Sequence, residues 1–280
     1  MRSREFWQEI IANQYAITDR ADLLELTDEL LDYLASPDPE LRDTFAYNIL
    51  SRWLAIYRYH NPEQLLVMTR WLLEQVDKGI GEIDSDTVFL RSYSIAILAL
   101  IVYRDVKEHF MSQEDIRLIL DTAQSYLLYE QDLRPHDPEK GWINAIANVS
   151  GLLRYLAMHE LISTEQLQDI LATVSQKVCQ TAEQAFDHDE DDRLARVIIP
   201  VMIRPDLTRI EYSDWLEQFQ LWLKNHDTDG QYHAQHNATY QNIKRFLRAL
   251  HTQMLLTSHL SDSAESAQVD LLEVIRDFGL

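Results

Sequence analysis

Apolar residues recur along most of the chain at the spacing of an α-helix, with a repeat of about 3.6 residues. One stripe runs through Leu41, Phe45, Leu50, Trp53, Leu54 and Tyr57, and another through Leu65, Met68, Leu72 and Val76. The pattern predicts helices near residues 4–14, 21–35, 39–58, 62–77, 86–105, 112–129, 138–159, 163–185, 189–204, 208–225, 234–258 and 263–277. Because each stripe needs a neighbour to cover it, we expect an all-α fold.

Several of these helices are expected to begin at the same kind of signal. An Asp or Asn cap, a proline and a glutamate follow one another at Asp38-Pro39-Glu40, Asn61-Pro62-Glu63 and Asp137-Pro138-Glu139. A fourth start, Ser163-Thr164-Glu165-Gln166, has the spacing of a capping box. These signals predict helix starts near residues 39, 62, 138 and 163.

The arrangement of the helices follows from their pairing. Consecutive pairs span about 40 residues, which favours an α-α superhelix of stacked helical hairpins of the HEAT or armadillo kind. A compact helical array is the alternative, since no residue pattern recurs from pair to pair. The six glycines and seven prolines leave few breaks, and no long linker divides the chain, so one domain over residues 1–280 is predicted.

Charge and apolar runs limit the partners. The chain has 25 Lys and Arg against 46 Asp and Glu, a net charge of −21, and no basic run, so no nucleic-acid partner is expected. The longest apolar run, Ile95 to Tyr103, is far shorter than the roughly 20 residues that span a bilayer, so no membrane partner is expected. The N-terminus lacks a secretory signal and Cys179 is the single cysteine, which together favour a cytoplasmic protein.

One polar segment differs from the packing pattern around it. Between Tyr126 and His159 the chain brings charged, aromatic and amide side chains together near one expected helix start, and Arg91 is expected to pair with them. The predicted ligand-binding residues are Arg91, Glu130, Asp132, Arg134, Trp142, Asn144 and Asn148. They form either a ligand or peptide pocket or a buried network that fixes helix packing. No catalytic residue, metal site or cofactor is predicted.

Two further clusters have simpler interpretations. The run from Asp187 to Asp192 holds five carboxylates, but its spacing does not match a calcium loop, so a solvated turn that caps the next helix is expected. His226, His233 and His236 could hold zinc, but no closed ligand set is visible. Cys179 lies in a helical pattern and is expected to be a packing residue.

Several fragments resemble a bacterial family known as domain of unknown function 2785. They include SPDPELRDTFAY from Ser36, KGIGEIDSDTVFLRSYS from Lys78, YLLYEQDLR from Tyr126, KGWINAIAN from Lys140, FDHDEDDRLA from Phe186 and NIKRFLRAL from Asn242. The resemblance implies an all-α, HEAT-like superhelix in a bacterial cytoplasm and brings no established activity. Where the family commonly has two histidines after its Gly-Trp pair, this chain has Asn144 and Asn148, and it has Pro135 where the family tends to have glycine.

These observations favour a non-enzymatic binding protein or scaffold with a polar concave groove for a peptide or protein partner. The alternative is an enzyme, or a degenerate enzyme, with a small-ligand or former metal site around the helix that begins near Trp142. If relatives bind metal through the two histidines, this chain has lost that capability, because asparagine is a weak neutral ligand.

Overall fold

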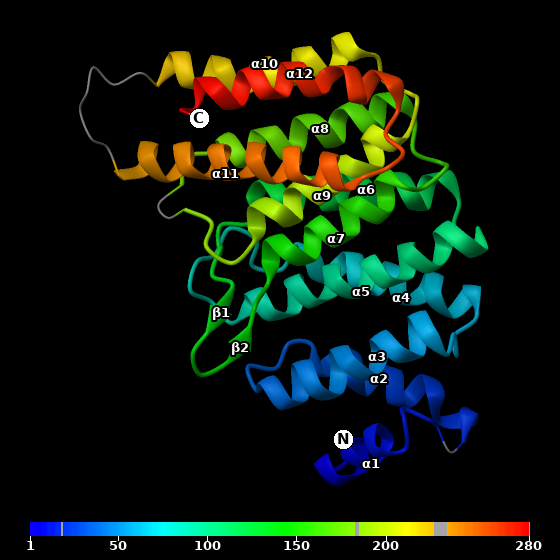
Figure 1. The fold of residues 1–280 in the computed structure, drawn as a ribbon. Coiled ribbons are helices and arrows are strands. Elements are labelled where there is room, and N and C mark those ends of the chain that lie inside the picture. The colour runs from blue at the N-terminus through cyan, green and yellow to red at the C-terminus, as the bar shows by residue number, and fades with distance from the viewer. Residues whose placement is uncertain (18, 183–184, 227–233, 280) are drawn as a thin grey trace. The chain divides into compact units, whose positions relative to one another are not determined.

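Helices make up most of the described chain (Figure 1), and the all-α prediction with stacked helical hairpins is confirmed. The computed structural model describes residues 1–17, 19–182, 185–226 and 234–279. The chain divides into two compact units, Met1–Tyr155 and Leu156–Leu280. The HEAT-like repeat and the single domain stay predictions.

The N-terminal unit is built from neighbouring helices and one small hairpin. Its elements are α1 (Arg4–Ala12), η1 (Arg20–Asp22), α2 (Leu23–Tyr33), η2 (Glu40–Tyr47), α3 (Asn48–Ser51), η3 (Arg52–Ile56), α4 (Pro62–Val76), α5 (Thr87–Glu108), α6 (Gln113–Tyr129), β1 (His136–Asp137), β2 (Gly141–Trp142) and most of α7 (Ala145–Ala157). Helix α2 packs on η2, and α4 packs on α5. The large buried side chains Trp7, Phe45, Trp53 and Phe89 belong to this core.

The described residues of the C-terminal unit form helices joined by loops. They are the end of α7, α8 (Thr164–Cys179), α9 (Glu190–Ile203), α10 (Arg209–Asn225), α11 (Ala234–Leu256) and α12 (Asp262–Asp277). Helix α9 packs on α11 and α10 packs on α12, and the aromatic rings of Trp215, Phe219 and Phe246 contact one another in the core.

Capping chemistry explains where two predicted helices begin. Asn61 accepts from the backbone N–H of Gln64, whose side chain accepts in turn from the Asn61 N–H, so α4 starts with a complete capping box and Pro62 in its first turn. Ser163 and Gln166 make the same reciprocal pair at α8. The predicted starts near residues 62 and 163 are therefore confirmed.

The predicted helix start near residue 138 is wrong. Asp137 accepts from the backbone N–H groups of Glu139 and Lys140, which closes the turn of the β1–β2 hairpin instead of capping a helix. Gly141 then takes a φ of +82°, which ends any helical path. The helix α7 begins later, at Ala145.

The segment from Glu40 to Ile56 is helical but carries two π-helical stretches, η2 and η3. Its apolar stripe steps by five residues from Phe45 to Leu50, and the wider π turn allows both side chains to be fully buried. The predicted helix over 39–58 is confirmed, while its wide turns were not predicted.

Helix α5 is a long, apolar helix of the N-terminal unit. Its length and composition alone would allow it to cross a membrane, but 78% of the relevant window is buried inside the protein. Ile95, Ile97, Leu98 and Ile101 are fully buried. The helix is therefore accounted for as the core of this unit.

Candidate functional site

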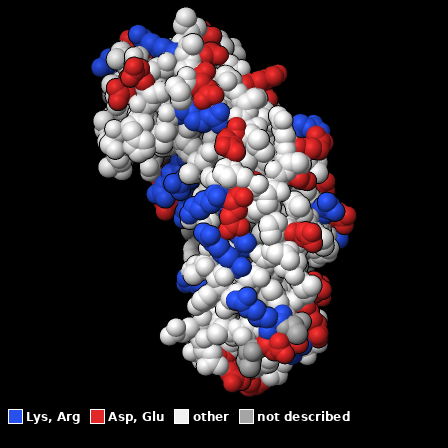
Figure 2. Space-filling model, turned by 90° about the vertical axis from the view of Figure 1, so that its right-hand side faces the viewer, with Lys and Arg blue, Asp and Glu red and all other residues white. Residues whose placement is uncertain are grey.

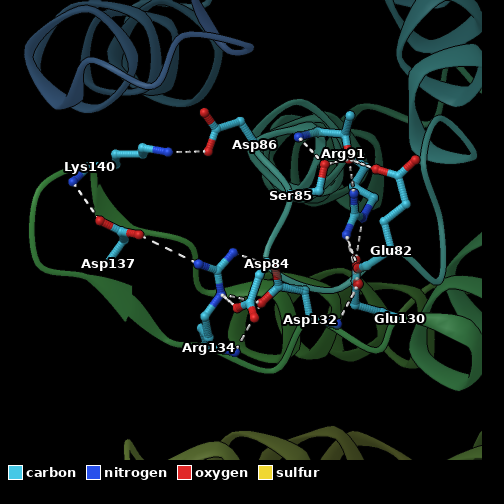
Figure 3. A network of polar contacts seen from close by, with 11 residues as sticks. Glu82, Asp84, Ser85, Asp86, Arg91, Glu130, Asp132, Arg134, Asp137 and Lys140 are labelled. Atoms are coloured by element: carbon cyan, nitrogen blue, oxygen red, sulfur yellow. Dashed lines mark hydrogen bonds and ion pairs between the residues drawn. The ribbon is translucent and has the colours of Figure 1, made fainter.

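The predicted polar cluster centres on a buried ion pair between α5 and the end of α6 (Figure 3). Arg91 donates from Nε and Nη2 to the two carboxylate oxygens of Glu130, at 2.5 and 3.0 Å. Its Nη1 donates to Thr87 Oγ1 at 2.8 Å, and Nη2 also reaches the Glu82 carbonyl oxygen at 3.3 Å. Neither Arg91 nor Glu130 is exposed. Burial by itself lowers the pKa of Arg91, but the bonds and charge of Glu130 outweigh it and raise that pKa overall.

A second pair continues the network toward the surface. Asp132 is fully buried and accepts from Nε and Nη2 of Arg134 at 2.8 and 2.5 Å. The half-buried Arg134 also contacts Asp84 at 3.1 Å and Asp137 at 3.5 Å (Figure 3). Hydrogen bonding to Asp132 raises the pKa of Arg134. Each buried charge of this network thus has a partner of opposite sign, and the donors of Arg91 and Arg134 face protein oxygens.

The remaining predicted residues lie on the hairpin and the start of α7. Trp142 is 48% exposed, and its ring meets His136 edge-on at 4.9 Å. Asn144 takes a left-handed φ of +55° before the first residue of α7. The half-buried Asn148 donates from Nδ2 to the Oγ of Ser92 at 2.9 Å, which ties α7 to α5.

The structure therefore separates the predicted residues into two groups. Arg91, Glu130 and Asp132 were expected to line a groove, but they are buried. Arg91 and Glu130 pair with each other and Asp132 pairs with Arg134, which favours the buried packing network. Arg134, Trp142, Asn144 and Asn148 retain some exposure. For these four, ligand binding stays a prediction.

The other predicted clusters have clear positions. Ligand atoms of Asp187, His188 and Glu190 lie within 4.8 Å of one another, and Asp187 raises the pKa of the exposed His188. The rings of His226 and His236 lie 5.2 Å apart, whereas His233 lies outside the described residues. Burial raises the pKa of the Cys179 thiol to about 12, as expected of a packing residue.

A groove that the sequence analysis did not identify lies between α2 and α4. It has a volume of about 670 Å³. Its lining residues are Leu24, Thr27, Asp28, Leu31, Asp32, His60, Glu63, Gln64, Val67, Met68 and Trp71. Leu24 and Val67 are 49% and 64% exposed, so the two helices present apolar side chains that their own packing does not cover.

Carboxylates flank the apolar wall of this groove. Asp28 and Asp32 stand one helical turn apart on α2, and Glu63 stands in the first turn of α4. Partial burial and the neighbouring Asp32 raise the pKa of Asp28. Within the described part of the chain, no Lys, Arg or His forms an ion pair with any of the three.

His60 is a buried polar residue in the lining of the groove. It is 1% exposed, and its Nε2 lies 2.8 Å from the hydroxyl of Thr27. Burial, assisted by the nearby charge of Arg104, lowers the pKa of His60 to about 4. The imidazole is therefore neutral at physiological pH.

The spacing of the lining residues along α2 is a sequence signal for this face of the groove. Leu24, Asp28 and Leu31 share one face of α2, distinct from the fully buried stripe of Leu26 and Leu30. A second apolar face on a helix whose first is already covered indicates an additional contact surface.

Comparisons with known proteins agree with the family resemblance. Residues 77–252 match the model of the family described as "Protein of unknown function (DUF2785)", and the chain belongs to this family. No curated protein matches the chain. A crystal structure of an engineered protein is 16% identical with a TM-score of 0.41, covering 90% of this chain and 97% of its own.

Proposed function

For this member of the DUF2785 family, we propose a non-enzymatic binding function in which the α2–α4 groove holds a basic amphipathic helix of a partner protein. The observation that carries the proposal is the combination of exposed apolar side chains with carboxylates that have no cationic partner within the described residues. Apolar residues of the helix would pack on Leu24, Val67 and Trp71. Its Lys and Arg residues would reach the carboxylates on both rims.

The carboxylates of the groove favour one class of partner helix over others. A neutral apolar helix would leave Asp28, Asp32 and Glu63 without partners at its edge, and an acidic helix would be repelled by them. A helix with flanking Lys and Arg satisfies both the apolar wall and the rims. The net charge of −21 adds long-range attraction for such a partner.

The proposal is tested with two labelled peptides of about five helical turns each. One carries a leucine stripe flanked by lysines, and the other has glutamates in place of the lysines. Fluorescence anisotropy should show binding of the lysine peptide that weakens with added salt, and no binding of the glutamate peptide. Equal binding of both peptides would exclude the charge-selective groove.

A matched pair of variants separates the groove from the general acidity of the protein. Asp28→Lys/Asp32→Lys should weaken the lysine peptide at least about tenfold, which corresponds to about 1.4 kcal/mol. Glu165→Lys/Asp169→Lys changes the net charge equally, with the same spacing, on the exposed face of α8 outside the groove. This control should lose far less affinity, and equal losses in the two variants would overturn the proposed site.

A further inference from the structure

One surface of the N-terminal unit combines tyrosine rings with Arg and Lys side chains. This tyrosine surface comes from η1, η3, the segment after η3 and the last turns of α5, and it is defined by Arg20, Arg52, Tyr57, Tyr59, Tyr103 and Lys107. The C-terminal end of α5 lies on the right-hand side of Figure 1, and Figure 2 shows that Lys and Arg side chains gather on that side.

Two stacked rings form the first platform of the tyrosine surface. The rings of Tyr57 and Tyr59 lie 5.2 Å apart with an angle of 16° between their planes, and the Arg20 guanidinium lies 5.0 Å from the Tyr59 ring centroid. Tyr57 donates from its hydroxyl to the Gln14 carbonyl oxygen at 2.6 Å, which fixes the ring. Tyr57 is nevertheless 39% exposed, and of the described residues Tyr59 alone stacks on it. The ring therefore offers a fixed, flat surface to a planar group.

A second platform lies at the end of α5. Lys107 Nζ lies 4.3 Å from the ring centroid of Tyr103 and donates to its hydroxyl at 2.6 Å. The bond to Lys107, assisted by the nearby charge of Arg58, lowers the pKa of Tyr103. Arg58 therefore stands between the two platforms, since it also separates Tyr57 from Tyr59 in sequence. It pairs with Glu108 at 3.2 Å and is still 50% exposed.

The other positive charges of the tyrosine surface are not neutralised by carboxylates. In the part of the chain that the structure describes, Arg20, Arg52 and Lys107 form no ion pair with Asp or Glu. Arg52 lies instead over the ring of Tyr15, 5.4 Å from its centroid and next to the Gln14 carbonyl that Tyr57 binds. Exposed cations that lack carboxylate partners, in a chain with 46 Asp and Glu, are available to an external anion.

We propose that the tyrosine surface binds single-stranded nucleic acid. Bases stack on the rings of Tyr57 and Tyr103, and the cations around each ring contact the phosphates. Sequence alone does not indicate this partner, because the chain has no basic run and the cations come from separate segments. The net charge of −21 opposes the approach of a long strand, so a short strand is the better ligand.

The combination of rings and cations favours this ligand over other anions. An acidic peptide would neutralise the cations but leave both rings without a stacking partner. A duplex holds its bases in its own stack, and a mononucleotide would occupy one platform only. The proposal is independent of the α2–α4 groove, which is tested with peptides.

The stacking is tested by fluorescence anisotropy with a labelled single-stranded RNA of about ten nucleotides. Tyr57→Leu keeps an apolar contact with Tyr59 but removes the ring, so it should weaken binding at least about fivefold. The matched control is Tyr129→Leu, which changes a 65% exposed tyrosine outside the tyrosine surface and should leave the affinity unchanged. Equal affinities of the two variants would overturn the proposal.

The phosphate contacts are tested independently by the salt dependence of binding. Arg52→Gln should reduce the slope of log Kd against log salt by about 0.7, the value for one phosphate of a single strand. Arg117→Gln is the control, because this exposed arginine already contacts Glu114 and Asp121, and it should keep the slope of the wild type. An unchanged slope in Arg52→Gln would also overturn the proposal.

Competition identifies the class of ligand. Unlabelled duplex RNA, a glutamate-rich peptide and AMP, each added at the charge concentration of the strand, should displace the labelled RNA poorly. Efficient displacement by the duplex or the peptide would show a surface that selects charge alone, and efficient displacement by AMP would show a mononucleotide site; each result overturns the proposal. Absence of RNA binding overturns it as well and leaves the α2–α4 groove in place.

Discussion

The buried network at the end of α6 and the groove between α2 and α4 carry charge in opposite arrangements. Arg91 and Glu130 are fully buried and bonded to each other, whereas Asp28 and Asp32 are exposed and lack cationic partners among the described residues. A charge that is already paired inside the protein stabilises packing and cannot bind a partner without breaking that pair. In this chain, therefore, a dense group of polar residues is not the best indicator of a binding surface.

The largest effect is expected in the buried network. Arg91→Ala leaves Glu130 buried without a counter-charge and should lower the free energy of unfolding by about 3–5 kcal/mol. Arg117→Ala, which removes an exposed arginine with two carboxylate contacts, should have a far smaller effect because solvent screens those contacts. Urea denaturation followed by circular dichroism measures both, and similar losses would show that the buried pair is not structural.

The next effect concerns His60 in the lining of the groove. In the unfolded chain His60 binds a proton near pH 6.5, but in the folded protein it does so only near pH 4. Its contribution to stability is therefore fully present above pH 6.5 and is lost as the pH falls toward 4, by about 3 kcal/mol in all.

The measurement compares the wild type with His60→Gln, which keeps a polar side chain beside Thr27 but does not titrate. Urea denaturation at several pH values should show that the wild type loses stability relative to the variant as the pH falls through this window. Parallel pH profiles would contradict the neutral, buried histidine.

A smaller effect is expected in the β1–β2 hairpin, where the backbone at Gly141 is constrained. Gly141→Ala places a Cβ 3.0 Å from that of Pro39 at a φ of +82°, so it should cost about 1–3 kcal/mol. Gly151→Ala is the control, because a Cβ there meets nothing within 4 Å and the helix favours alanine by about 1 kcal/mol. Thermal unfolding should move in opposite directions in the two variants, and a neutral Gly141→Ala would contradict the strained turn.

The smallest effect on the free energy of unfolding is expected in the groove. Asp32→Asn removes the repulsion between two carboxylates one helical turn apart and should raise the free energy of unfolding by about 0.2–0.5 kcal/mol. Asp132→Asn removes a buried, paired carboxylate and should lower it. Chemical denaturation of the two variants should therefore give changes of opposite sign, and a loss of stability in both would contradict the distinction between the regions.

Local signals predicted the helical architecture because they act within a few residues. The capping boxes at Asn61 and Ser163 fixed the starts of α4 and α8, where the cap and its partner are three residues apart. The same type of signal failed at Asp137. There the outcome depends on Arg42, far away in sequence, which donates to the carbonyl oxygens of Lys140 and Trp142.

The polar network was found from sequence because Glu130, Asp132 and Arg134 are close neighbours, but sequence does not report burial, and burial decides their role. The groove was missed for the converse reason. Asp28 and Glu63 each resemble an ordinary solvated position, and their common surface exists only after α2 and α4 lie on either side of it. The spacing along α2 indicates its second face, but no short-range pattern shows that α4 lies opposite that face.

The π-helical stretch η2 is a place where the chain can lose one residue and keep its later side chains directed toward the core. Deleting one residue between Glu40 and Tyr47 would let the wide turn tighten into an ordinary α-helix. Trp53 and Leu54 would then keep their direction toward the core. The same deletion within α5 would rotate every later side chain by about 100° and turn its buried residues outward. Natural length variation in relatives should therefore concentrate in η2 and avoid α5.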